Sequence, residues 1–296
     1  MYSPKNIYIL GAGAMGSIYG AGLSEKYPVT LIARSETVNK IKNNGLEIRG
    51  LINKTYKLPA QEKITRITDN AIIFLTTKVH ESDSAIQSIK SLVKKDTLLV
   101  VVQNGVGQEK EYQKKLNCTV IRAISECGAA VISPGIVKFN SNKATYVNKN
   151  GGGKIAHILK TAGFKVQSVN DIKKKEWEKL IINCVINPLG AILNVRNDKL
   201  NHPVLEKIKE NIVKECVEVA NATGVRIEQN YFKKVNNFIS KTKNYNSTLQ
   251  DLKLGKTTEI DYLNGKIVEL GKKYSIETSI NQMLFSLIKA MEDLAV

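Results

Sequence analysis

Short, nearly continuous apolar runs recur along the first half of the chain, with amphipathic stretches between the first of them. Runs of valine, isoleucine and leucine without alternation are typical of parallel strands buried on both faces. The helix-like stretches between them indicate βαβ units and an open α/β sheet. The runs are NIYIL at 6–10, VTLIA at 29–33, AIIFL at 71–75, TLLVVV at 97–102 and TVIRAIS at 119–125.

The pattern changes after Gly128. The stretches PGIVKF and KATYV predict two short antiparallel strands, at a sheet edge or in a flap. GGGKIAHILKTAGF then predicts an amphipathic helix that stops at Gly163. We therefore expect a domain boundary near residue 170, with a first domain at 1–170 and a second at 171–296.

Helical periodicity dominates the second half of the chain. One predicted helix has Pro203 at its first position and ends at Gly224. Another follows Thr258, a residue type that favours the N-cap. SINQMLFSLIKAMEDL predicts a last amphipathic helix, and the apolar positions of these helices suit a domain core or a homodimer interface equally. The expected fold class is an α/β domain followed by an all-helical domain.

One predicted helix, WEKLIINCVINPLG at 177–190, is apolar on nearly every side yet carries Lys179, Asn183 and Asn187. Their spacing of four residues stacks the three side chains on one helix face. A solvent-facing stripe is the simple explanation, but the apolar surroundings indicate a mostly buried helix, where unpaired polar groups cost several kcal/mol. We therefore expect a ligand opposite the stripe. Pro188 also removes a helical N–H, so the carbonyl of Cys184 needs another partner.

Composition places the chain among ordinary globular proteins. It has 296 residues, of which 43% are hydrophobic and 24% charged. No apolar run reaches the length of roughly 18 to 20 residues that spans a bilayer. The N-terminal segment lacks the pattern of a signal peptide, so we expect a cytoplasmic protein without a membrane partner.

The net charge of +17 does not by itself indicate a nucleic-acid partner. Only six of the 44 basic residues are arginines, and they are not clustered with aromatic residues for base stacking. A positive field still favours anionic substrates and cofactors. The four cysteines and three histidines are scattered without metal-ligand spacing, so we expect free thiols and no metal site.

The segment GAGAMG follows the first apolar run and precedes a helix-like stretch, with glycines at 11, 13 and 16. This is the GxGxxG pattern in the context of a βαβ unit, and it predicts a dinucleotide site. At the end of the second run, where NAD enzymes usually place an acidic residue, the chain has Arg34 and Ser35. A guanidinium and a hydroxyl suit the 2′-phosphate of NADP, although Glu36 leaves NAD open.

Polar groups follow two further predicted strands: Lys78 after one, and Gln103, Asn104 and Gly105 after the next. Ligands of open α/β sheets lie at the carboxyl ends of the strands, so we expect these side chains to reach a cofactor or substrate. With a nicotinamide nearby, the Lys179 ammonium could supply a proton to a ketone that accepts hydride.

Together GAGAMG, LTTK, VVQNG, WEKLIINCVINPLGAI and NSTLQDLKLGKTTEIDYLNG resemble the ketopantoate reductase (2-dehydropantoate 2-reductase) family over most of the chain. The resemblance implies a Rossmann-type domain joined to an all-helical domain, with the active site in the interdomain cleft. It also implies NADPH-dependent reduction of 2-dehydropantoate, a small 2-oxo acid, to D-pantoate, a step toward pantothenate and coenzyme A.

The resemblance assigns roles to individual residues. It implies that Lys179 is the catalytic proton donor and that Glu259 is a catalytic residue near both Lys179 and the cofactor. The implied cofactor-binding set is Gly11, Ala12, Gly13, Ala14, Met15, Gly16, Arg34, Lys78, Asn104 and Glu259. The implied substrate-binding set is Asn104, Lys179, Asn183, Asn187, Asn197 and Ser247.

Gly190 departs from the family pattern, which usually has a hydroxyl residue after the NPL turn. We expect the change to loosen the helix end or to alter a hydrogen bond near the site, which leaves the rate and the substrate open. One rival function is reduction of another branched 2-oxo acid. Another is a dinucleotide sensor without turnover, against which Lys179 argues because sensing needs no proton donor.

Overall fold

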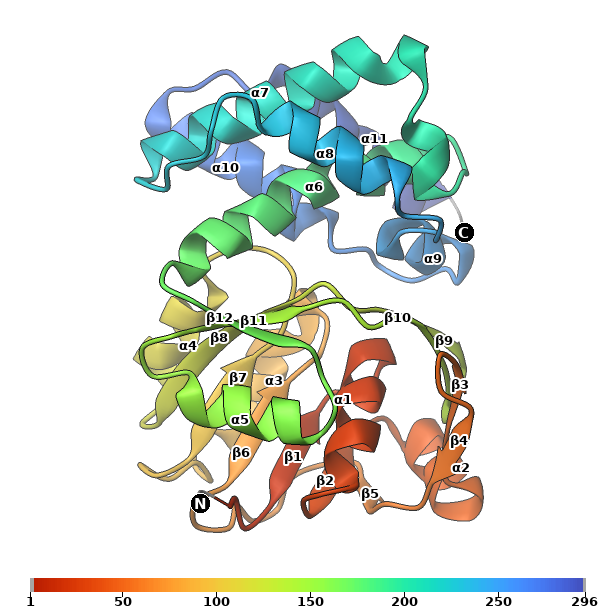
Figure 1. Ribbon diagram of the computed structural model, residues 1–296, viewed down its shortest axis with the longest axis vertical. Helices are drawn as coiled ribbons and strands as arrows, with labels where there is room; N and C mark the ends of the chain where they lie inside the picture. The colour runs from red at the N-terminus through yellow and green to blue at the C-terminus, as the bar shows by residue number, and fades with distance from the viewer. Residues whose placement is uncertain (1–2, 295–296) are drawn as a thin grey trace. The chain divides into compact units, whose positions relative to one another are not determined.

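The computed structural model describes residues 3–294, which form two compact units. The first unit extends to Gln103 and resumes at 107–172, and the second contains Asn104–Val106 and the chain from Lys173 onward. The chain therefore passes from one unit to the other at three points (Figure 1). Within residues 3–294, no helix combines the length and the apolar character needed to cross a membrane.

The first unit is built on an eight-stranded sheet with the strand order β12-β11-β8-β7-β6-β1-β2-β5. All neighbouring pairs are parallel except β8 and β11, which run antiparallel. The strands are β1 (Ile7–Leu10), β2 (Val29–Ile32), β5 (Ala60–Gln61), β6 (Ile72–Leu75), β7 (Leu98–Val101), β8 (Thr119–Ser125), β11 (Thr145–Asn148) and β12 (Val166–Val169). The helices are α1 (Ala14–Ser24), α2 (Ser35–Asn44), α3 (Ser82–Ile89), α4 (Gln108–Lys115) and α5 (Gly153–Thr161), with the 3-10 helix η1 (Val79–Glu81).

Alternate residues of the central strands enter two separate hydrophobic cores. In β1, Ile7 and Ile9 lie in one core, whereas Tyr8 and Leu10 lie in the other. Every residue of β1 is buried. The expectation that these strands are buried on both faces is therefore confirmed, and it explains why their sequences do not alternate between polar and apolar residues.

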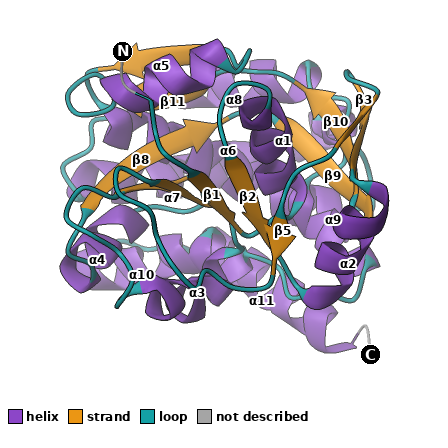
Figure 2. Cartoon of the chain, turned by 90° about the horizontal axis from the view of Figure 1, so that it is seen from below, coloured by secondary structure: helices purple, strands orange, loops and turns teal. Residues whose placement is uncertain are grey.

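A second, four-stranded sheet has the order β4-β3-β10-β9 and packs against α1 (Figure 2). Its strands are β3 (Leu46–Gly50), β4 (Lys54–Tyr56), β9 (Gly128–Ser133) and β10 (Ile136–Ser141). The sequence predicted that PGIVKF and KATYV form two short antiparallel strands, at a sheet edge or in a flap. Both strands do pair antiparallel with a neighbour, β10 with β9 and β11 with β8. They lie in different sheets, however, and β10 also pairs in parallel with β3. The pairing of β10 with β3 joins segments far apart in the chain, which local periodicity cannot reveal.

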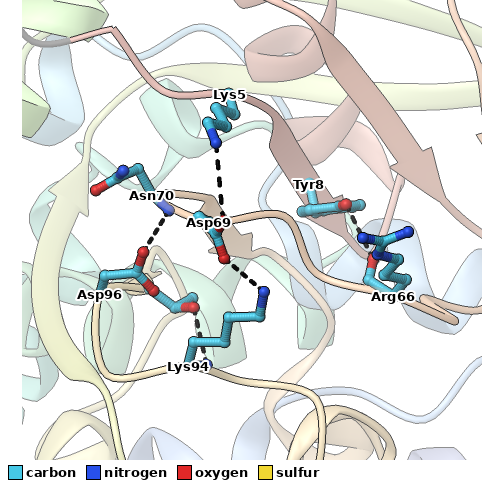
Figure 3. A network of polar contacts seen from close by, with 8 residues as sticks. Lys5, Tyr8, Arg66, Asp69, Asn70, Lys94 and Asp96 are labelled. Carbon is cyan, nitrogen blue, oxygen red and sulfur yellow. Dashed lines mark hydrogen bonds and ion pairs between the residues drawn. The ribbon is translucent and has the colours of Figure 1, made fainter.

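A polar network ties together the amino ends of three adjacent strands, β1, β6 and β7 (Figure 3). Asp69, just before β6, accepts from Lys94 at 2.6 Å and lies 3.7 Å from Lys5. The Lys94 ammonium lowers the pKa of the Asp69 carboxyl. The backbone N–H of Asn70 donates to Asp96 at 2.7 Å. These exposed contacts lie at the amino ends of the strands. The glycine loop lies at the opposite edge of the sheet, at the carboxyl ends, where ligands of open α/β sheets bind.

The second unit is helical and has its own core, centred on the buried face of α6. Val106, from the short segment that crosses over from the first unit, is part of that core. The helices are α6 (Ile172–Ile192), α7 (Glu206–Ala222), α8 (Tyr231–Ser240), α9 (Ser247–Lys253), α10 (Asn264–Tyr274) and α11 (Ser279–Leu294), with 3-10 helices η2 (Asn197–Leu200), η3 (Pro203–Leu205) and η4 (Ile260–Tyr262). The predicted fold class, an α/β domain followed by a helical domain, is confirmed.

Candidate active site

The glycine loop lies between β1 and α1, beside the point where the strand order reverses from β2 to β6. Gly11 has φ +105°, and a Cβ there would lie 2.6 Å from the backbone nitrogen of Thr77. A Cβ at Gly16 would lie 2.6 Å from Oγ1 of Thr76 and would overlap the Gly11 carbonyl. At Gly13, by contrast, a Cβ would have no atom within 4 Å. Gly11 and Gly16 thus allow close packing of the loop, whereas Gly13 leaves open space at the N-terminus of α1.

These features fit a pyrophosphate. Gly13 is the N-cap of α1, and the first turn contains Ala14, Met15 and Gly16 and no acidic residue. The N–H groups of a first helical turn have no intrahelical acceptor, and the helix dipole favours negative charge there. The loop is fixed by backbone bonds from Gly11 and Ala12 to the carbonyl of Ile32, at 3.1 and 2.8 Å. The loop is thus held rigidly beside the space that a phosphate would occupy.

Arg34 precedes α2 as its N-cap residue and its side chain is 82% exposed. Its guanidinium forms an ion pair with the carboxylate of Glu81 in η1, a partner that the sequence did not indicate. Lys78 is the N-cap residue of that same 3-10 helix. Arg34 and Lys78, two basic residues predicted to bind the cofactor, therefore both adjoin η1, the short helix that also contains the acidic residue Glu81.

The two strand ends that carry polar residues are adjacent. Strands β6 and β7 pair in parallel, with Leu75 opposite Val101. Beyond them, the buried amide of Gln103 donates to the Thr77 carbonyl at 2.8 Å and to Ser82 Oγ at 2.5 Å. The guanidinium of Arg122, which is 5% exposed, donates to the Gln103 carbonyl at 2.8 Å. Gln103 is therefore a fixed anchor from which the chain passes into the second unit.

Asn104, the next residue, lies in the second unit and donates a hydrogen bond from Nδ2 to Glu259 Oε2 at 2.8 Å. Glu259 is 5% exposed and directly precedes η4. The structure thus brings together two residues that the family resemblance assigned to cofactor and substrate. A simple role for Glu259 in stabilising its own helix does not explain this long-range contact.

The polar row of Lys179, Asn183 and Asn187 lies on α6, as expected from its spacing. Lys179 and Asn183 are half-buried and Asn187 is 2% exposed, so the row is not an exposed surface stripe. The neighbouring Pro188 lies inside the helix, and the carbonyl of Cys184 accepts a hydrogen bond from Asn264 Nδ2 at 3.0 Å. The expectation that this carbonyl needs an outside partner is confirmed.

The end of the polar row meets two other predicted substrate residues. Asn187 Nδ2 donates to Ser247 Oγ, the first residue of α9, at 3.3 Å. Asn197 is 1% exposed and its Oδ1 accepts from Asn246 Nδ2 at 3.4 Å. Asn246, which the sequence reasoning did not single out, is the N-cap of α9, so Ser247 is not needed as a cap. An asparagine directly before a helix is a capping signal that could have identified it.

The structure explains why glycine occupies position 190. A Cβ at this position would overlap Nδ2 of Asn246 and would lie 3.6 Å from Oδ1 of Asn197. The expectation of a loosened helix end is wrong, because the space is filled by the Asn246 amide, which also donates to the carbonyl of Ile186 at 3.1 Å. The expectation of an altered hydrogen bond near the site agrees with the bonds that the Asn246 amide makes in this space, to the Ile186 carbonyl and to Asn197 Oδ1.

All four cysteines are free thiols, and three are buried. Burial and the neighbouring Cys216 raise the pKa of the Cys184 thiol. Because Cys184 lies on α6 among core residues and is held in its neutral form, its role is packing.

Both units match known proteins. Residues 7–152 match the family model described as Ketopantoate reductase PanE/ApbA, and residues 171–292 match the one described as Ketopantoate reductase PanE/ApbA C terminal. The chain is 35% identical to a 2-dehydropantoate 2-reductase of Pyrococcus horikoshii, over 97% of this chain and 98% of that protein. It is 30% identical to a 2-dehydropantoate 2-reductase of Archaeoglobus fulgidus, with the same coverage.

Solved structures agree with these matches. A PanE/ApbA family ketopantoate reductase from Ralstonia eutropha JMP134 superimposes with a TM-score of 0.91 at 28% identity, covering 98% of this chain and 99% of that one. A D-mandelate dehydrogenase solved with NADH and anilino(oxo)acetate superimposes with a TM-score of 0.88 at 30% identity, again covering 98% and 99%. The chain is therefore an oxidoreductase that belongs to the ketopantoate reductase family.

Proposed function

We propose that the protein reduces 2-dehydropantoate to D-pantoate with NADPH, as a step toward pantothenate and coenzyme A. The observation that carries the proposal is the half-buried row of Lys179, Asn183 and Asn187, which ends in the hydrogen bond from Asn187 to Ser247. The relatives at 35% and 30% identity that are named 2-dehydropantoate 2-reductase support the same substrate.

The glycine loop and the N-terminus of α1 would hold the pyrophosphate of the cofactor, and Arg34 with Lys78 would bind the 2′-phosphate. The open space at Gly13 and the absence of acidic residues in the first turn of α1 support this role. When bound, the reduced nicotinamide supplies the hydride that is added to the ketone carbon. The NADP preference rests on the charge of Arg34, since a guanidinium binds phosphate through charge-assisted hydrogen bonds.

Lys179 would supply the proton that the reduced ketone oxygen needs. Hydride addition to C2 of the oxo acid leaves negative charge on its oxygen, and an ammonium within hydrogen-bond reach stabilises this charge and donates the proton. Asn183, Asn187 and Ser247 supply neutral hydrogen-bonding groups that can orient the carboxylate and hydroxyl of a small acid. Asn104, held by Glu259, adds a further amide.

The test is the loss of near-ultraviolet absorbance of the reduced nicotinamide when the protein is mixed with 2-dehydropantoate. Parallel reactions contain NADPH or NADH, and a panel of other 2-oxo acids. Oxidation of NADPH that is fastest with 2-dehydropantoate supports the proposal. Binding of NADPH without turnover of any acid would indicate a sensor and would overturn it.

A second candidate is a reductase of another 2-oxo acid. The chain is 30% identical to a D-mandelate dehydrogenase that was solved with NADH, and this similarity favours the second candidate. The ion pair between Arg34 and Glu81 also favours it, because Arg34 is then already engaged and less available to a 2′-phosphate. The panel should therefore include benzoylformate, the 2-oxo acid related to mandelate. Faster turnover of benzoylformate with NADH would replace the first candidate with the second.

A further inference from the structure

The side-chain amide of Asn246 joins three segments of the second unit. Its Nδ2 donates to the carbonyl of Ile186 in α6 at 3.1 Å and to Oδ1 of Asn197 at 3.4 Å. Its Oδ1 accepts from the backbone N–H of Leu249 at 2.9 Å, which caps α9. Asn246 is only 4% exposed, so these bonds take the place of water contacts. A carbonyl has two lone pairs, so Ile186 can accept this donor beside a helical N–H.

These bonds of Asn246 require a residue without a side chain at position 190. Any side chain at position 190 would overlap the Asn246 amide nitrogen, because a Cβ there would lie well inside van der Waals contact of it. Glycine inside a helix is otherwise unfavourable compared with alanine. The amide could move aside only by giving up buried hydrogen bonds, and unsatisfied buried polar groups are costly. Gly190 and Asn246 are therefore one structural pair.

The segments joined by Asn246 carry three of the residues proposed to bind the acid. Ser247 follows it directly and accepts from Asn187, which lies one residue after the Ile186 carbonyl. Asn197 contacts the amide itself and is also fixed by its backbone N–H, which donates to the carbonyl of Asn244 at 3.0 Å. A displacement of Asn246 would change the spacing of Asn187, Asn197 and Ser247 together.

We propose that Asn246 is a positioning residue for the acid substrate and that Gly190 is the space it requires. The pair sets the distances among three neutral hydrogen-bonding side chains and so determines which 2-oxo acid is bound. The identity of the ligand as a 2-oxo acid rests on the function proposed above, whereas the coupling of residues 190 and 246 does not.

The test is a double-mutant cycle with wild type, Gly190→Ala, Asn246→Ala and the double variant. Each single substitution should raise KM for 2-dehydropantoate on the order of tenfold, because each removes a set of buried hydrogen bonds. KM for NADPH should change less than about twofold, since the pair touches no residue assigned to the cofactor. The double variant should be no worse than Asn246→Ala, because the new methyl group then has space.

Two further variants separate positioning from simple stability. Asn246→Asp keeps the acceptor for Leu249 but loses the donor to Ile186 and Asn197, so it should raise KM for the acid while retaining the cap of α9. Gly153→Ala is the matched glycine control, because Gly153 is also helical and a Cβ there meets no atom within 4 Å. Its KM for the acid should equal that of wild type.

Additive effects in the cycle, or an unchanged KM for the acid in Asn246→Ala, would overturn the proposal. If wild type reduces another acid of the panel, the function proposed above fails and the cycle is measured with that acid. If wild type reduces none, the side-chain amide signal of Asn187 in an NMR spectrum of asparagine-labelled protein replaces KM. That signal should shift in Asn246→Asp but not in Gly153→Ala, and an unshifted signal would equally overturn the positioning role.

Discussion

The Asn104 amide donates a hydrogen bond to the Glu259 carboxylate across 155 positions of sequence, and this contact lies wholly within the second unit. Replacing Asn104 with aspartate would set two carboxylates against each other at a site where Glu259 is 5% exposed. We expect Asn104→Asp to lower kcat/KM by about 10²-fold or more and to lower the melting temperature at neutral pH.

The pH dependence distinguishes repulsion from a lost contact. Like charges raise the pKa of one carboxyl, so protonation at mildly acidic pH removes the repulsion. The difference in melting temperature between Asn104→Asp and wild type should therefore shrink as the pH falls, whereas the difference for Asn104→Ala should not. Thermal unfolding of the three proteins between neutral pH and about pH 4.5 measures this, and parallel curves for the two variants would contradict it.

Lys179→Ala should lower kcat by about 10²-fold or more, the usual contribution of a positioned proton donor. Binding of NADPH, followed by nucleotide fluorescence, should remain nearly intact. Lys173→Ala is the control on the same helix, because Lys173 is exposed in its first turn. Turnover that is equal in both variants would remove Lys179 from the mechanism.

Arg34→Ala should raise KM for NADPH by about tenfold or more and change KM for NADH little, because only NADPH has the 2′-phosphate. Glu81→Gln should have the opposite effect and tighten NADPH binding. That gain should be small, about twofold to fivefold, because the Arg34–Glu81 pair is exposed and such pairs contribute little. Equal losses for both cofactors in Arg34→Ala would contradict the phosphate role.

Asn264→Ala should destabilise the protein by about 1–3 kcal/mol, since it leaves the buried carbonyl of Cys184 without its side-chain donor. The cost should be smaller in a Pro188→Ala background, where residue 188 regains an N–H that can bond to that carbonyl. Denaturant unfolding of the two single variants and the double variant gives the coupling. An identical cost in both backgrounds would show that Asn264 does not compensate for the proline.

Glu292 in α11 anchors the segment that leads into Glu259, because its Oε1 accepts from the Thr258 N–H at 2.7 Å. Burial raises the pKa of its carboxyl, but hydrogen bonds from Lys289 and Thr258 outweigh burial and lower the pKa below its ordinary value of 4.5. The ionised carboxylate therefore stabilises the fold above about pH 4.5, and this contribution is lost as the pH falls through the folded pKa.

Glu292→Gln should accordingly lower the melting temperature at pH 7 by about 1–3 °C, a small value because its ion-pair partner Lys289 is 36% exposed. The difference from wild type should vanish at pH values below the folded pKa, where both side chains are neutral. A difference that persists there would mean that packing, and not charge, is lost.

Local sequence pattern was sufficient for much of the fold and for part of the site. The central strands could be predicted because burial on both faces leaves a continuous apolar run, and the glycine loop because it has a fixed spacing beside β1. The polar row on α6 was visible because helical periodicity places Lys179, Asn183 and Asn187 together. Each of these signals lies within a single element.

The remaining features depend on contacts between distant segments. Strand β3 was not predicted because it is short and partly exposed, and its partner β10 lies more than 80 residues away. Glu81 and Asn246 were missed for the same reason, since their importance comes from Arg34 and Gly190. Gly190 could be recognised as unusual from the sequence, but its cause required the position of the Asn246 amide.

The short segment Asn104–Val106 limits how these two units can be recombined. It belongs with the helical unit, where Asn104 contacts Glu259 and Val106 enters the core, although it is encoded in the middle of the α/β unit. Consider a chimera in which a relative's sequence replaces everything after residue 172. Val106 of this chain would then pack against the relative's helices, and Asn104 of this chain would face the relative's residue at position 259. Residues 104–106 should therefore be exchanged together with the helices after residue 172, because substitutions in this tripeptide must stay compatible with residues more than 60 positions later in the chain.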